Sequence, residues 1–296
     1  MGIPYFGETL ALTTAVLWSV AVILFKKSGE TVDPLGLNLF KNTLTLLLIP
    51  PTMLAFDQGF FLSVPYRDYL LLMLSGVLGI GIADTLFFKS LNLLGAARSA
   101  IVDCLYSPAI ILLSIFWLGE RLTIIQAAGV VLILSAVLAI GREKGLIEIT
   151  RRQLIIGILS GASAMFTMGV SIVMIKPLLE RSPVLWVIEI RLIGAAVSLF
   201  AVLPFHPRSR KVVHSIMEAK SWKYMIPGSI LGTYLALVFW IGGMKYAPAS
   251  VASALNQTSN IFIFILAALF LKERITPYKI AGIIMAVAGV FLVILG

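Results

Sequence analysis

Ten runs of about 20 mostly apolar residues follow one another along this chain, separated by short polar breaks. A helix needs about 20 such residues to cross the hydrocarbon core of a bilayer. Backbone exposed to lipid must satisfy its own hydrogen bonds, and β-barrels that do so show alternating segments of about ten residues rather than continuous apolar runs. The pattern predicts an all-α integral membrane protein with ten transmembrane helices, at 9–26, 35–56, 69–90, 95–118, 123–141, 154–175, 183–204, 224–245, 249–271 and 277–295.

The composition agrees with a protein that is embedded in lipid. Only 12% of the 296 residues are charged and 59% are hydrophobic, whereas a soluble domain carries about 25% charged residues. The net charge of +9 comes from basic residues in the breaks between apolar runs. This placement is typical of membrane proteins, whose cytoplasmic loops carry an excess of Lys and Arg, and it argues against a nucleic-acid-binding surface. Residues 1–8 lack the basic start of a signal peptide, so we expect the first apolar run to be a retained helix.

The second half of the chain repeats the first. Residues 79–137 align without a gap to 232–290 at a constant offset of 153. We interpret 1–141 and 154–296 as two five-helix repeats joined by a connecting loop at 142–153. Five is an odd number, so the second repeat must be inverted relative to the first. Inverted repeats are typical of secondary transporters, whose substrate site lies near the midplane where the repeats meet.

Short motifs at the same place in each half carry a family resemblance. Gly119-Glu120-Arg121-x-Thr123 recurs as Lys272-Glu273-Arg274-x-Thr276, and each block is followed by Ala-Gly. Together with the repeat, these motifs resemble the drug/metabolite transporter superfamily, and more narrowly its EamA-type members, over about 9–295. The resemblance implies a basket of ten helices around a central cavity. It also implies export or exchange of metabolites such as amino acids, sugars, nucleotide derivatives or amphipathic drugs.

One position departs from the wider superfamily. Small four-helix relatives carry a coupling glutamate in the first helix, and the position that lines up here is Trp18. The proton-coupling mechanism of those relatives is therefore not implied for this chain.

Ionisable residues inside the apolar runs are the first candidates for a site, because each costs roughly 2.5–3.5 kcal/mol to insert. They are Lys41, Asp84, Asp103, Glu189 and Arg191. The repeat places polar residues of the ninth run at the depth of Asp103, and a zwitterionic solute would suit such a mixture of groups. The predicted substrate-binding residues are Trp18, Lys41, Asp84, Asp103, Tyr106, Asn256, Gln257 and Asn260.

Each candidate also has a purely structural interpretation. Asp84 or Asp103 would then pair with Lys41 only to tie helices together, and Glu189 and Arg191 would serve other helix contacts in the same way. Trp18 would then face lipid or a neighbouring helix instead of a substrate.

The predicted function is secondary transport by alternating access, and not enzyme catalysis. The sequence has no Walker A, HExxH or dinucleotide-binding pattern, and its one cysteine excludes an internal disulfide or a cysteine metal cluster. We therefore expect no cofactor and no metal. The expected partners are a small-molecule substrate and the lipid bilayer, with no nucleic acid, in a monomer or homodimer.

Two other functions remain open from the sequence. A multidrug efflux transporter would need a roomy aromatic cavity with an anionic site. An integral membrane enzyme acting on lipids would need a cluster of polar groups at the membrane surface, and His206, His214 and Glu218 are the residues available for one.

Basic residues are distributed unevenly between the two sets of loops. Five lie on the side of the termini and sixteen on the opposite side. Because cytoplasmic loops carry the excess of Lys and Arg, we expect a multi-pass protein of the inner (plasma) membrane with both termini outside the cytoplasm.

Overall fold

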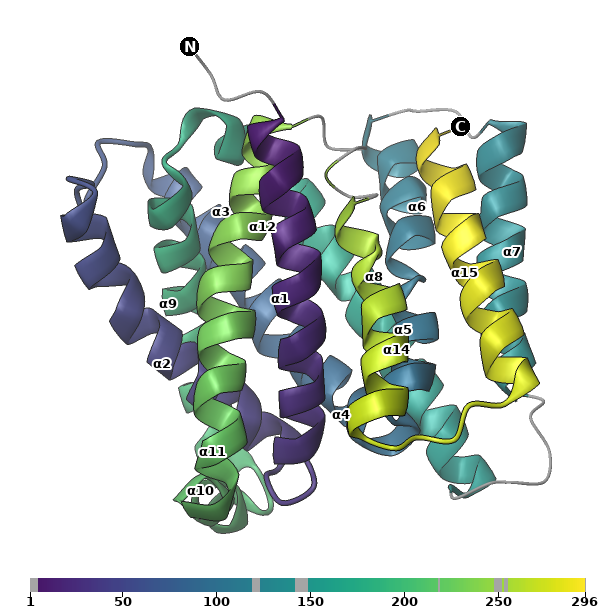
Figure 1. Ribbon diagram of the computed structural model, residues 1–296. Helices are drawn as coiled ribbons and strands as arrows, with labels where there is room; N and C mark the ends of the chain where they lie inside the picture. The colour runs from purple at the N-terminus through teal and green to yellow at the C-terminus, as the bar shows by residue number, and fades with distance from the viewer. Residues whose placement is uncertain are drawn as a thin grey trace.

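The computed structural model describes residues 5–118, 123–141, 149–217, 219–247, 252 and 255–295. Within these ranges the regular elements are all helical (Figure 1). In the first half they are α1 (Phe6–Ser28), α2 (Pro34–Ala55), α3 (Tyr66–Gly76), the π-helix η1 (Val77–Ala83), α4 (Asp84–Leu94), α5 (Ala96–Asp103), α6 (Tyr106–Leu118) and α7 (Ile124–Gly141). In the second half they are α8 (Arg151–Arg181), α9 (Val184–Val202), the short 3-10 helix η2 (Leu203–Phe205), α10 (Ser209–Met217), α11 (Ala219–Gly228), the π-helix η3 (Ser229–Leu235), α12 (Ala236–Tyr246), α14 (Ser259–Phe270) and α15 (Pro277–Leu295).

The predicted all-α membrane fold is confirmed. Five helical segments of the described chain are long and apolar enough to cross a bilayer, namely Phe6–Ser28, Tyr66–Leu94, Arg151–Arg181, Val184–Phe205 and Trp222–Tyr246. Shorter apolar helices lie at Ile124–Ala139, Leu255–Phe270 and Pro277–Val293. Large apolar side chains such as Leu47, Leu138 and Leu159 are exposed on the outside of the bundle, where lipid would cover them. The count of ten transmembrane helices remains a prediction.

Two details differ from the sequence prediction. The predicted helix 95–118 is divided into α5 and α6 at Cys104-Leu105. Pro108 lies four residues beyond Cys104, and a proline ring clashes with the carbonyl four residues before it. The polar break between the predicted spans 183–204 and 224–245 contains the amphipathic helix α10.

Local chemistry explains where several helices begin. The Asp33 side chain accepts a hydrogen bond from the Leu35 amide (2.9 Å), and Pro34 occupies the first helical position of α2. Thr150 and Gln153 form a capping box at the start of α8. Gly95 separates α4 from α5 with a φ of 83°, which glycine adopts at little cost.

Equivalent contacts recur in the two halves. A π-helix interrupts the span of α3 and α4 at Val77–Ala83, and a second one interrupts the span of α11 and α12 at Ser229–Leu235. Gly79 packs on Ser171 of α8, and Gly232 packs on Ala21 of α1. Gly232 is the repeat counterpart of Gly79 at an offset of 153, and Ser171 is the counterpart of Ala21 at an offset of 150. The two contacts are therefore equivalent in the two halves. The first helices of the halves, α1 and α8, begin at opposite ends of the molecule (Figure 1).

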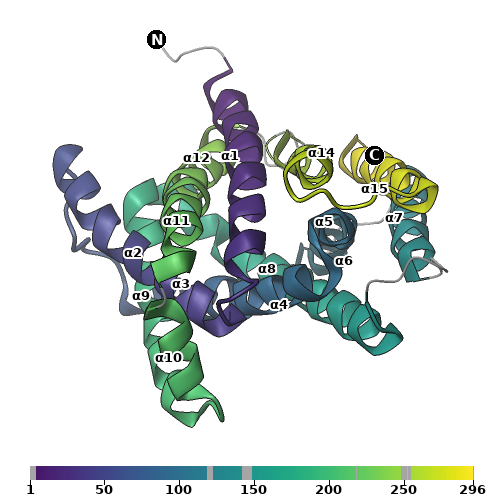
Figure 2. The same cartoon turned by 60° about the horizontal axis from the view of Figure 1, so that its bottom comes forward.

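The close pairing of α7 and α15 completes the bundle at one edge (Figures 1 and 2). A Cβ atom on Gly129 would meet the carbonyl oxygen of Gly289, and one on Gly289 would meet that of Gly129. Glycine at both positions lets the two backbones approach closely, as small residues do in membrane helix packing.

Candidate functional site

A cavity of about 140 Å³ lies between the two halves. Both halves contribute side chains, because the cavity is bordered by α1, α2, η1, α4, α5 and α6 on one side and by α8, α9, η3, α12 and the segment 256–259 on the other. The polar or aromatic lining side chains are Thr14, Trp18, Lys41, Asp84, Phe87, Asp103, Tyr106, Arg191, Thr233, Trp240, Asn256, Gln257 and Ser259. The site therefore lies at the interface between the repeats, as the inverted-repeat architecture predicts.

The structure brings most of the predicted site residues together. Seven of the eight line the cavity, namely Trp18, Lys41, Asp84, Asp103, Tyr106, Asn256 and Gln257. Asn260 is fully buried behind them, and its Nδ2 atom donates to Oε1 of Gln257 (2.7 Å). Arg191 also lines the cavity, whereas Glu189 does not. The role of these residues in binding a substrate remains a prediction.

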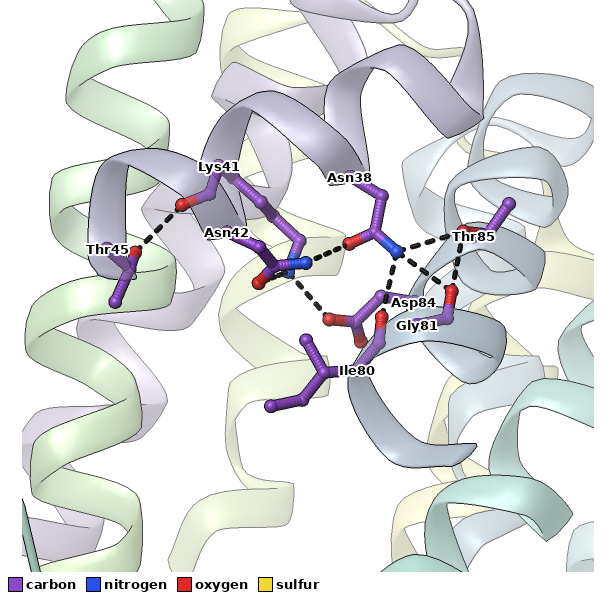
Figure 3. Close-up of polar contacts among 8 residues, drawn as sticks. All are labelled: Asn38, Lys41, Asn42, Thr45, Ile80, Gly81, Asp84 and Thr85. Atoms are coloured by element: carbon purple, nitrogen blue, oxygen red, sulfur yellow. Dashed lines mark hydrogen bonds and ion pairs between the residues drawn. The ribbon is translucent and has the colours of Figure 1, made fainter. Parts of the chain in front are cut away.

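Lys41 and Asp84 form a buried ion pair (Figure 3). The Nζ atom of Lys41 lies 2.6 Å from Oδ2 of Asp84 and also donates to Oδ1 of Asn42 (3.2 Å). The same amine lies 5.7 Å from the ring centroid of Phe88, within the range of a cation–π interaction. The pairing that the structural interpretation expected for Asp84 is thus present, although both residues also face the cavity.

Asn38 links this ion pair to the π-helix η1. A π-helix departs from the regular α-helical ladder and leaves backbone carbonyls in need of other donors. The Nδ2 atom of Asn38 donates to the carbonyl oxygens of Ile80 (2.8 Å) and Gly81 (2.9 Å), as Figure 3 shows. Its Oδ1 atom accepts from Nδ2 of Asn42 (2.8 Å). This chain of hydrogen bonds fixes Asp84, the first residue after η1, opposite Lys41.

Arg191 and Asp103 differ from this pair because neither is neutralised by direct contact. The Arg191 side chain is buried, and its Nη2 atom donates to Oγ of Ser171 (3.1 Å). Its Nε and Nη1 atoms have no hydrogen-bond partner within the described chain. Asp103 forms no ion pair among the described residues, and its carboxylate interacts with the neutral amide of Asn260. The cavity thus presents one guanidinium and one carboxylate that lack an ionic partner at contact distance.

An aromatic cluster closes the cavity toward the end of α1. The ring centroids of Trp18 and Phe87, which line the cavity, are 5.8 Å apart. Behind them, Phe25 and Phe88 are almost fully buried with ring centroids 5.0 Å apart. These rings separate the cavity from the polar end of the bundle.

Two lining residues, Met168 and Trp240, were missed because the sequence analysis started from ionisable residues inside the apolar runs. Met168 is the counterpart of Trp18 at an offset of 150, and Trp240 is the counterpart of Phe87 at an offset of 153. Both line the cavity. The repeat alignment held the signal that would have found them, since a cavity on a two-fold axis is lined by equivalent positions.

Other sequence candidates lie away from the cavity or outside the described residues. Glu273 caps α5, with Oε1 accepting from the Ala96 amide (2.6 Å) and Oε2 from the Ala97 amide (3.1 Å). Its repeat counterpart Glu120 lies outside the described residues, as does Glu218. Among the residues that the structure describes, no group of His, Cys, Asp or Glu could hold a metal ion.

Similar proteins place this architecture among transporters. An uncharacterized transporter of Archaeoglobus fulgidus is 24% identical over 290 residues, which is 97% of each chain. The uncharacterized transporter YetK of Bacillus subtilis is 28% identical over 129 residues, covering 44% of this chain and 38% of YetK. The probable 4-amino-4-deoxy-L-arabinose-phosphoundecaprenol flippase subunit ArnF of Photorhabdus laumondii is 31% identical over 70 residues, covering 23% and 56%.

A solved crystal structure shares the fold. It superposes with a TM-score of 0.70 at 20% sequence identity, over 97% of this chain and 95% of the other. The sequence model of the EamA-like transporter family matches this chain twice, at residues 5–142 and at residues 155–295. With the duplicated motifs, the apolar helices and the cavity between the halves, these matches show that the chain is a multi-pass membrane protein of the EamA-like transporter family.

Proposed function

We propose that this protein is a secondary transporter that exports or exchanges a small zwitterionic metabolite by alternating access. The observation that carries the proposal is that Arg191 and Asp103 lie in one cavity between the halves and that neither has an ionic partner at contact distance among the described residues. A buried charge is costly until an opposite charge or hydrogen bonds satisfy it. A solute with a carboxylate and an ammonium group would satisfy both residues at once.

The neutral lining supports the same substrate class. Asn256 and Gln257 offer amide donors and acceptors, while Trp18, Phe87 and Trp240 offer apolar faces. Cavities of this kind use a few polar groups to orient a ligand and apolar walls to bury the rest of it. A zwitterion with a modest apolar side chain matches these groups better than a large polar solute does.

The repeat supplies the mechanism that we propose. Two equivalent halves can exchange their arrangements, so that a cavity open to one side becomes open to the other. The matched π-helices η1 and η3 border the cavity from both halves, and π-helical segments are frequent at functional sites. We propose that they are the points at which the two spans bend.

A multidrug transporter is the second candidate, because aromatic rings and the Asp103 carboxylate meet in the cavity. A matched substrate set separates the two. Cells that overexpress the protein are loaded with an apolar amino acid, its methyl ester (a cation) and its N-acetyl derivative (an anion), and efflux is followed. The proposal predicts fastest efflux of the zwitterion, with Arg191→Gln removing the advantage over the ester. Faster efflux of the ester or of bulky aromatic cations would instead support the multidrug function.

A further inference from the structure

The two halves of the chain differ in how their buried basic residue is neutralised. In the first half, Lys41 on α2 pairs with Asp84 on α4 at 2.6 Å (Figure 3). Arg191 on α9 is the repeat counterpart of Lys41 at an offset of 150, and Leu237 on α12 is the counterpart of Asp84 at an offset of 153. The second half therefore keeps the buried base but has a leucine where the neutralising acid would lie.

No other acidic residue on the same span replaces the missing one. The span Trp222–Tyr246 contains no Asp or Glu in its sequence. The Arg191 side chain is fully buried, and its Nη2 atom donates to Oγ of Ser171. Its Nε and Nη1 atoms find no acceptor anywhere in the part of the chain that the structure describes. Buried donors without acceptors cost free energy, so this guanidinium group is prepared to bind an acceptor from a ligand.

The hydrogen-bond network that holds Asp84 is also missing from the second half. Asn38 connects that network to the carbonyls of η1 and accepts from Asn42. Their repeat counterparts at an offset of 150 are Ile188 and Leu192, which are fully buried and apolar. The second half therefore has no equivalent amides to support a carboxylate of its own at this place.

The place equivalent to Asp84 is accessible from the central cavity. Arg191 and Leu237 both line the cavity, and their helices α9 and α12 pack against each other. A group on a ligand in the cavity can therefore lie next to both residues. Since Leu237 offers no charge and no hydrogen bond, Arg191 is the residue that would attract such a group.

We propose that the substrate's carboxylate binds between Arg191 and Leu237, in the place that Asp84 holds beside Lys41 in the first half. We call this place the carboxylate subsite. It rests on the proposed function and adds the orientation of the substrate, whose ammonium group then points toward Asp103. Leu237 determines specificity, because an acidic residue there would pair with Arg191 and exclude the substrate's carboxylate.

The variant Leu237→Asp tests the geometry, because it supplies the carboxylate that the second half lacks. Leu237→Asn is the matched control, with the same shape and no charge. Each is made in the wild-type chain and together with Arg191→Gln, and thermal unfolding in detergent compares the four proteins without any need for transport. We expect Leu237→Asp to melt above Leu237→Asn when Arg191 is present and below it with Arg191→Gln. A difference between the two variants that Arg191→Gln does not change would overturn the proposed geometry.

Ligand binding to the full-length protein tests the chemistry of the subsite. Calorimetric titration uses an apolar amino acid, its N-acetyl derivative and its methyl ester, of which only the ester lacks a carboxylate. Relative to Leu237→Asn, we expect Leu237→Asp to weaken binding of the two carboxylates at least about tenfold, because it competes for Arg191. The ester should bind Leu237→Asp at least as tightly as Leu237→Asn. Equal losses for all three ligands would overturn the proposal, and so would a wild-type protein that binds neither carboxylate.

These measurements separate the carboxylate subsite from transport itself. Binding that follows the expected pattern, with no exchange of the amino acid in liposomes, would support the subsite and contradict secondary transport. Exchange that Leu237→Asp and Leu237→Asn reduce to the same extent would support transport and contradict the subsite.

Discussion

The Nζ atom of Lys41 on α2 lies 2.6 Å from the Oδ2 atom of Asp84 on α4, inside the membrane-spanning part of the bundle. The side chains are 2% and 13% exposed, respectively. Because they neutralise each other, they leave the net charge of the cavity to Arg191 and Asp103. The two partly buried carboxylates of the cavity, Asp84 and Asp103, should therefore respond differently to mutation.

Replacing one member of the Lys41–Asp84 pair should destabilise the fold. Asp84→Asn leaves a buried ammonium group without its partner, which costs about 3–5 kcal/mol. The double variant Lys41→Met/Asp84→Asn removes both charges and should recover most of the lost stability. Thermal unfolding of purified protein in detergent measures this. A double variant no more stable than Asp84→Asn would show that the two residues are not energetically coupled.

Asp103→Asn should spare folding and impair transport. Asp103 has no ion pair to lose among the described residues, and asparagine keeps its shape and its contact with Asn260. We expect a melting temperature within a few degrees of wild type and at least a tenfold lower transport rate. Asp57→Asn is the matched control, because Asp57 is exposed in a loop far from the cavity. Equal loss of folded protein and of transport would assign Asp103 a structural role instead.

The crossing of α3 and α9 should not tolerate a single methyl group. A Cβ atom on Gly76 would overlap the backbone of Arg191, and one on Gly194 would overlap the backbone of Met73. Gly76→Ala and Gly194→Ala should each cost about 1–3 kcal/mol by overpacking and should shift Arg191 in the cavity. Gly59→Ala, where only the Phe61 carbonyl lies within 4 Å, should be neutral. Unchanged melting temperatures for Gly76→Ala and Gly194→Ala would contradict this packing.

Cysteine labelling can test the orientation predicted from the basic residues. The natural Cys104 is buried, so one new cysteine can be read without removing it. A membrane-impermeant maleimide should label Asp57→Cys in intact cells and should label Arg208→Cys only after lysis. The reverse pattern would place both termini in the cytoplasm.

The general fold could be predicted from the sequence because its strongest feature is the series of long apolar runs, and the bilayer restricts what such runs can form. A run of 20 apolar residues has few alternatives in a bilayer, and charges such as Asp84 are rare enough there to indicate a cavity. The break at Cys104-Leu105 was harder to foresee. It depends on whether Pro108 kinks a helix or divides it, and packing around the proline decides that.

The pairing of charges could not be predicted from the sequence. Lys41 had two candidate acidic partners, and only the hydrogen bonds from Asn38 to the carbonyls of η1 place Asp84 opposite it. A π-helix has no simple sequence pattern, so this geometry was out of reach. The lining residues Met168 and Trp240 could have been found from the repeat, since their counterparts Trp18 and Phe87 line the same cavity.

Transport by purified protein in liposomes tests the central claim most directly. Vesicles loaded with an unlabelled apolar amino acid and free of ATP are diluted into buffer that contains the same amino acid in labelled form. We predict accumulation of label that Arg191→Gln and Asp103→Asn reduce at least tenfold and Asp57→Asn leaves unchanged. An absolute requirement for ATP would contradict secondary transport, and equal accumulation by wild type and both cavity variants would contradict the assignment of the central cavity as the substrate site.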